Sequence, residues 1–169
     1  MPKQVYNLPI TGIASFAKYP ICTNLDELDA DVCVMGIPYD MGAPYLTGTK
    51  FGPRRIREVS CHYGRGDAGF WDPERLTQYL EAPVKVVDAG DVDMHPMDFH
   101  ESFDNVTEAV RKIISKGAIP VMMGGDHSVT IPTARALDMY DDLCIVKFDA
   151  HLDFGKRTWT NVSPMRMIS

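Results

Sequence analysis

The chain has 169 residues, of which 45% are hydrophobic, and its formal net charge is −6. This length allows one domain with a sizeable core, and the composition excludes a disordered chain. The acidic balance and the lack of any basic run longer than two residues argue against a nucleic-acid partner. The four cysteines form no CxxC pair, and no long apolar segment follows the amino terminus. We therefore expect a cytoplasmic protein without a disulfide framework, signal peptide or membrane span.

Apolar runs and turn residues predict strands that alternate with helices. The clearest helix begins at Asp98, carries an apolar stripe that includes Phe103, Val106 and Val110, and ends before Gly117. In chain order we expect a strand over 31–38, a helix over 54–62, a short helix over 72–80, a strand over 84–92, the helix over 98–116, a strand over 119–123, a helix from 128 or 130 to 140, and a strand over 143–148.

The predicted strands are apolar throughout, which is typical of strands buried on both faces. Their alternation with helices indicates an α/β fold in which helices cover a parallel sheet. Residues 1–30 have no readable period, and we expect an irregular segment there. In open parallel sheets, ligands bind at the carboxyl ends of the strands. The residues that follow each strand are therefore the candidates for a functional site.

Two predicted strands end in residues that bind metals. The last strand leads directly into Asp149, His151 and Asp153, and a spacing of two places these side chains on one side of an extended backbone. The strand before it ends in Gly-Gly and then Asp126 and His127. Singly, each residue has an ordinary structural explanation, such as a turn cap or a solvated loop acid. Together they favour a metal site, because crowded carboxylates repel one another unless a cation lies between them.

The candidate ligands offer oxygen and nitrogen atoms and no thiolate. This set favours manganese, or another hard to borderline ion, over a structural zinc. Two adjacent ions would need a carboxylate that bridges them. Asp149 is the first ligand of its run and could offer one oxygen to each ion. Such a pair lowers the pKa of a bridging water into the neutral range and yields a hydroxide that can attack the carbon of a guanidinium.

Other acidic residues near these strand ends have less certain roles. Asp126 either accepts a hydrogen bond from the second nitrogen of the ligand His127 or caps the helix that follows, and the residues do not decide between these. The acids Asp88, Asp91 and Asp93 form a rival cluster at the end of another predicted strand. We expect that cluster to be structural because no histidine accompanies it.

Five stretches together resemble the arginase/agmatinase (ureohydrolase) family. The resemblance extends from about residue 30 to the last residue and is closer to the agmatinase branch than to the arginases. The two ligand-bearing stretches are highly specific in combination. The five stretches cover residues 36–40, 48–57, 88–92, 124–128 and 148–153.

The resemblance implies a three-layer α/β/α sandwich around a parallel sheet, incomplete here, with residues 31–169 as the amino-terminal part of one domain. It implies two Mn²⁺ ions, one bound by His127 and Asp153 and the other by His151, with Asp149 bridging them. The implied reaction is hydrolysis of a guanidino C–N bond in a small linear substrate, which releases urea and an amine. Full-length members of this branch are usually homo-oligomers, and neither nucleic acid nor a membrane is implied as a partner.

Two features depart from the family pattern. The family completes its site with two further aspartates on a later strand, and no such motif precedes Ser169. We therefore expect this chain to be an amino-terminal portion that is poorly active or inactive alone. The family also has a His-Gly-Ser/Thr-Pro pattern after the ligand run, and Asn161 stands at the place of that histidine. An asparagine cannot titrate, so we expect a substrate other than agmatine or altered proton transfer.

Three functions are compatible with these residues. The first is manganese-dependent, agmatinase-like hydrolysis of a linear guanidino compound by metal-bound hydroxide. The second is a related hydrolysis of a formimino or other amidine substrate, which would release formamide in place of urea. The third is a non-catalytic homologue that binds a metal or a partner without turnover. A dinucleotide-binding module is disfavoured because the Gly-Gly pair after the strand is not part of a G-x-G-x-x-G motif.

Overall fold

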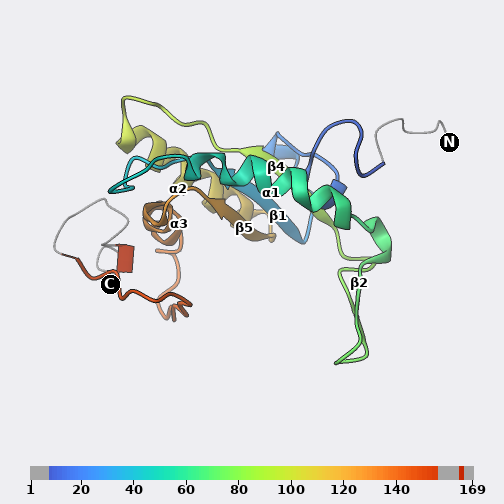
Figure 1. The fold of residues 1–169 in the computed structure, drawn as a ribbon. Helices are drawn as coiled ribbons and strands as arrows, with labels where there is room; N and C mark the ends of the chain where they lie inside the picture. Colours follow the sequence, from blue (N-terminus) through green and yellow to red (C-terminus); the bar gives the residue numbers. More distant parts are fainter. Residues whose placement is uncertain (1–7, 156–163, 166–169) are drawn as a thin grey trace.

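A computed structural model describes residues 8–155 and 164–165 (Figure 1). Its main sheet has three parallel strands in the order β4-β1-β5, which are Val86–Asp91, Val32–Ile37 and Ile119–Gly124. Residue Val32 of the central strand pairs with the first residue of each neighbouring strand, so the three strands begin in register. The first three strands that the sequence predicts are therefore confirmed, and so is their parallel arrangement.

Helices cover both faces of this sheet. Helices α2 (Phe99–Ser115) and α3 (Thr130–Arg135) pack together on one face, and α1 (Gly52–Ser60) lies on the other. None of the helices in the described residues is both long and apolar enough to cross a bilayer. Short 3₁₀ helices connect these elements: η1 Phe16–Lys18, η2 Leu25–Glu27, η3 Thr49–Phe51, η4 Cys61–Tyr63, η5 Gly66–Ala68 and η6 His127–Val129.

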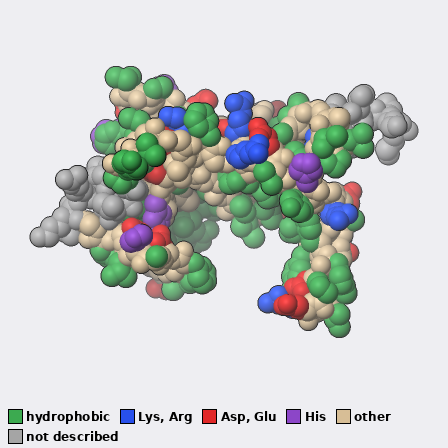
Figure 2. All heavy atoms as spheres, viewed as in Figure 1, with side chains coloured by type: hydrophobic (Ala, Val, Ile, Leu, Met, Phe, Trp, Pro, Cys, Tyr) green, Lys and Arg blue, Asp and Glu red, His purple; other side chains and the backbone are tan. Residues whose placement is uncertain are grey.

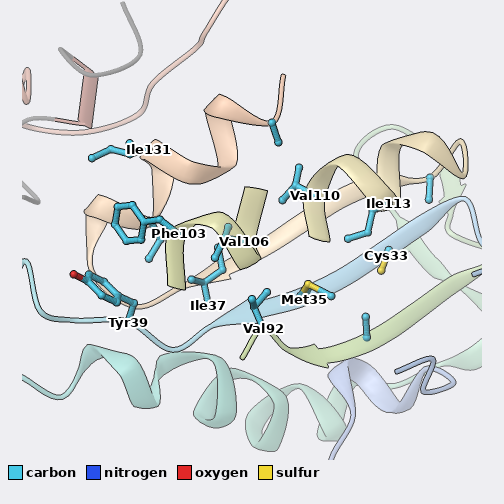
Figure 3. Packing of buried hydrophobic residues seen from close by; sticks show 14 of the residues in the cluster. Cys33, Met35, Ile37, Tyr39, Val92, Phe103, Val106, Val110, Ile113 and Ile131 are labelled. Carbon is cyan, nitrogen blue, oxygen red and sulfur yellow. The ribbon is translucent and has the colours of Figure 1, made fainter. Parts of the chain in front are cut away.

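The main core lies between the sheet and α2 (Figure 3). Alternate residues of β1 face this helix and meet its apolar stripe, as the period of two in a strand requires. Each side chain of the stripe that the figure labels is at most 1% exposed, so each contributes on the order of 1.5–3 kcal/mol through burial. The residues in contact are Cys33, Met35 and Ile37 of β1 and Phe103, Val106, Val110 and Ile113 of α2.

The acidic residues of β4 bind an arginine of α1. Nε of Arg57 donates to Oδ2 of Asp88 at 2.7 Å, and Nη1 donates to Oδ1 of Asp91 at 2.5 Å. Asp88 also accepts the backbone N–H of Phe16 at 2.7 Å, so the same carboxylate fixes η1. The cluster therefore joins α1 and the amino-terminal segment to the sheet, in agreement with the structural role expected for it.

The prediction of a short helix over 72–80 is wrong. The structure instead has an antiparallel hairpin of β2 (Phe70–Asp72) and β3 (Thr77–Tyr79), which extends away from the sheet (Figure 1). Oδ1 of Asp72 accepts two backbone N–H groups of the turn at 2.9 and 3.1 Å, and its Oδ2 binds Arg75 at 2.8 Å. Aromatic and β-branched residues flank this turn and favour strands, which outweighs the apparent helical spacing.

Two predictions near the carboxyl end are also wrong. The helix expected to reach residue 140 ends at Arg135 and continues as turns. The run over 143–148, expected as a strand, is irregular and mostly exposed in the structure. A strand forms only where its backbone pairs with a neighbour. Here Lys147 turns back onto Asp153 within its own segment.

Candidate metal centre

Side chains from two separate segments converge beyond the carboxyl end of β5. His127 begins η6 directly after this strand, whereas Asp149 and Asp153 belong to the irregular segment that follows α3. Nδ1 of His127 lies 2.9 Å from Oδ2 of Asp153 and 3.5 Å from Oδ2 of Asp149. Histidine and acidic side chains gather at the lower left of Figure 2, where Figure 1 places the carboxyl-terminal segment. The ligand atoms that these three residues can offer all lie within 4.8 Å of one another.

A lysine that sequence reasoning missed completes this cluster. Nζ of Lys147 lies 3.5 Å from Oδ2 of Asp149 and makes a closer ion pair with Oδ2 of Asp153. The same ammonium donates to the backbone carbonyl of His151. The sequence did hold a signal, because Lys147 stands two residues before Asp149 in the same alternation as the ligands. A positive charge thus already lies between the two carboxylates.

A turn, and not an extended strand, arranges the ligand run. Oδ1 of Asp149 accepts the backbone N–H of His151 at 2.8 Å, and Asp153 has a positive φ of 55°. This hydrogen bond, together with the charges of Lys147 and His127, holds the pKa of Asp149 below its usual value despite some desolvation. The prediction that a straight strand end aligns the three side chains is therefore wrong, although two of them still meet His127.

His151 is the predicted ligand that stays outside the cluster. Its side chain is 84% exposed, and its Nδ1 lies 3.5 Å from Oδ1 of Asp149. The other oxygen of Asp149, Oδ2, is the one that faces His127. Asp149 therefore has Oδ2 toward His127 and Oδ1 toward His151.

Asp126 occupies the capping position that was one of its two expected roles. Its Oδ1 accepts the backbone N–H of Ser128 at 2.9 Å, and its Oδ2 accepts the N–H of Gly42 at 2.7 Å. Asn161, the other predicted site residue, lies outside the described residues.

The donor set fits a divalent cation. One imidazole nitrogen and two carboxylates are close enough to share an ion, and they are hard to borderline ligands. The carboxylates repel each other, and a cation between them removes that repulsion. In the structure the Lys147 ammonium makes ion pairs with both carboxylates.

Comparison with known proteins identifies relatives of this chain. The model of the Arginase family matches residues 30–168. The guanidinopropionase of Pseudomonas aeruginosa is 32% identical over 160 residues, which are 92% of this chain and 48% of that protein. The agmatinase of Bacillus subtilis is 37% identical over 129 residues, 74% of this chain and 41% of that protein. The chain thus spans about half the length of the curated relatives it matches.

A solved structure matches over nearly the whole chain. The proclavaminate amidino hydrolase from Streptomyces clavuligerus superimposes with a TM-score of 0.79 at 29% sequence identity. The match covers 94% of this chain and 52% of that one. The three-stranded sheet with helices on both faces therefore matches about half of this solved structure.

Proposed function

This chain belongs to the arginase family, and from that membership we propose that it supplies the amino-terminal part of a manganese-dependent hydrolase. The proposed substrate is a linear guanidino compound. Water adds its oxygen to the guanidino carbon, the C–N bond to the alkyl nitrogen breaks, and the products are urea and an amine. Two relatives have names that indicate such substrates, the agmatinase of Bacillus subtilis and the guanidinopropionase of Pseudomonas aeruginosa.

One observation carries the proposal, namely the meeting of His127, Asp149 and Asp153 within 4.8 Å. These residues come from two separate parts of the chain, the start of η6 and the segment that follows α3. A structural acid cluster in this chain looks different. Asp88 and Asp91 are paired with the buried Arg57, and among the described residues neither makes an ion pair with a histidine.

Each residue has a proposed role toward the cations. His127 and Asp153 would hold one ion, His151 would hold the second, and Asp149 would bridge the two. Such a pair of ions supplies hydroxide at neutral pH. The chain's own contribution is to hold the imidazole and the carboxylates in place, and the lowered pKa of Asp149 favours the ionised form of that carboxylate.

The remaining properties are proposed with the function. We expect the full-length protein to be a cytoplasmic homo-oligomer whose partner is a small guanidino or amidine substrate. The 169-residue chain alone is expected to turn over poorly, since it spans about half of its relatives. Asn161 is proposed to change substrate choice or proton transfer.

Metal binding is the direct test on the 169-residue chain. We expect the purified chain to bind Mn²⁺, and His127→Ala to weaken binding by at least about tenfold, because one ligand is lost. His62→Ala is the matched control, since His62 is an exposed histidine on η4. Absence of Mn²⁺ binding by the wild-type chain would refute the proposal.

Product analysis on the full-length gene product that carries these residues separates the reactions. Release of urea from a panel of linear guanidino compounds is the expected result. Release of formamide from formimino substrates would identify the related amidine hydrolase instead. Bound metal without any hydrolysis would identify a non-catalytic homologue.

A further inference from the structure

The carboxylate of Asp126 joins two parts of the chain that are distant in sequence. It is 7% exposed and lies at the end of β5, one residue before His127. Its Oδ1 accepts the backbone N–H of Ser128 at 2.9 Å and also the Ser128 hydroxyl. Its Oδ2 accepts the N–H of Gly42 at 2.7 Å, in the loop that follows β1. One side chain thus binds both the η6 segment and this loop.

The loop, which we call the β1 loop (residues 39–48), has a second anchor at its base. Asp40 is 1% exposed, and its Oδ2 accepts the N–H of Gly48 at 2.6 Å and that of Lys50 at 3.4 Å. This carboxylate closes the loop on itself. Asp126 instead ties the loop to the end of another strand.

The backbones at this junction are also in close contact. The N–H of Asp126 donates to the carbonyl of Tyr39 at 2.8 Å, and that of Gly125 donates to the carbonyl of Ile37 at 3.0 Å. A Cβ atom on Gly125 would lie 1.8 Å from the Tyr39 carbonyl oxygen, so only glycine fits there. The strand end and the β1 loop therefore form one packed unit.

We propose that Asp126 is a positioning residue that locks the β1 loop to the η6 segment and thereby fixes the direction of His127. A helix cap alone would need only the bonds to Ser128. The additional bond to Gly42 makes the placement of His127 depend on the β1 loop. Its consequence for metal binding rests on the function proposed above, whereas the mechanical coupling does not.

Asp126→Asn is a sharp test because of the direction of the hydrogen bonds. Both oxygens of Asp126 accept from donors, whereas an asparagine has one acceptor oxygen and one NH₂ donor. Its NH₂ group must face a donor, either at Gly42 or at Ser128. One of the two bonds is therefore lost with little change in shape.

Amide hydrogen exchange on the metal-free chain measures the coupling. In Asp126→Asn we expect the amides of Gly42 and of residues 127–130 to exchange at least about tenfold faster, as loss of a hydrogen bond to a charged group requires. Asp40→Asn is the matched control, because it loosens the same loop from a carboxylate that is also buried but does not bind η6. This variant should accelerate amide exchange at Gly48 and leave the exchange rates of residues 127–130 within about threefold of the wild-type rates. Unchanged exchange over 127–130 in Asp126→Asn, or equal acceleration there in both variants, would overturn the proposal.

The wild-type chain gives an independent test should Asp126→Asn not fold. Exchange of the Gly42 and Ser128 amides is followed at increasing urea concentration. A single coupled opening gives both amides the same free energy and the same dependence on urea. Separate openings with different dependences would overturn the proposal.

A titration with Mn²⁺ tests whether this coupling affects metal binding. Free Mn²⁺ is followed by its electron paramagnetic resonance signal. Asp126→Asn should weaken binding by about 10- to 100-fold and Asp40→Asn by less than about threefold. If the wild-type chain binds no Mn²⁺, the proposed function fails, while the exchange data still decide whether Asp126 couples the two segments.

Discussion

Nδ1 of His127 lies 2.9 Å from Oδ2 of Asp153, and this contact joins the end of β5 to the irregular segment that follows α3. The carboxylate oxygen that faces His127 is the same one that binds the ammonium of Lys147. The two carboxylates of the cluster therefore already face a cation of the chain itself, the Lys147 ammonium. A divalent ion that enters must compete with it.

Lys147→Met is expected to increase the affinity of the chain for Mn²⁺. Two unit charges about 4 Å apart repel by about 1 kcal/mol in water, so removing the ammonium should tighten binding by at least roughly fivefold. The measurement is the same Mn²⁺ titration. Lys85→Met is the control, because Lys85 pairs with the exposed Asp29 elsewhere on the chain. Unchanged or weaker binding in Lys147→Met would contradict the competition between lysine and metal.

Asp40 should make the chain sensitive to acid. Burial by itself would raise the pKa of Asp40, but the N–H groups of Gly48 and Lys50 and the Lys50 ammonium hold it below its usual value. A pKa that is lower in the folded chain adds stability above about pH 4, and this stability is lost as the pH falls through the folded-state pKa.

Asp40→Asn removes this dependence. We expect urea unfolding at a series of pH values to show a shallower fall of the free energy of unfolding below about pH 4 in this variant. Asp141→Asn, at an exposed position, should keep the wild-type slope. A variant slope as steep as that of the wild type would assign the acid sensitivity to other groups.

Arg57 is expected to be the most costly charged residue to remove. It is 8% exposed and binds two acids that are left without a cation if it is lost. Arg57→Met should lower the free energy of unfolding by about 3–5 kcal/mol, because breaking one side of a buried pair leaves uncompensated charge. Arg55→Met removes an arginine that is 74% exposed in its side chain, and its cost should stay below about 1 kcal/mol in the same denaturation experiment.

The cysteines should differ widely in reactivity. Burial raises the pKa of Cys33 to about 11, and the thiolate is the reactive form, so this thiol should resist alkylation. Cys144 is exposed. Mass spectrometry after brief treatment of the native chain with iodoacetamide should find label on Cys144 first and on Cys33 last. Early labelling of Cys33 would show that the core opens readily.

The sequence by itself determined the parallel sheet, the helices on both faces and the two stretches that carry the metal ligands. Apolar periods of two and 3.6 are local, so the stripe of α2 and the buried run of β1 could be read without knowing what each packs against. The cap of Asp98 on α2 is equally local, since it binds the N–H of Glu101 at 3.0 Å.

Tertiary structure alone decided which residues meet. Neither the bond between Asp126 and Gly42 nor the contact between His127 and Asp153 follows from spacing, because side-chain partners depend on how distant segments fold back. The same reason explains the wrong predictions over 72–80 and 143–148. Whether a short apolar run becomes a strand depends on the backbone that lies beside it, and the composition of the run does not contain that information.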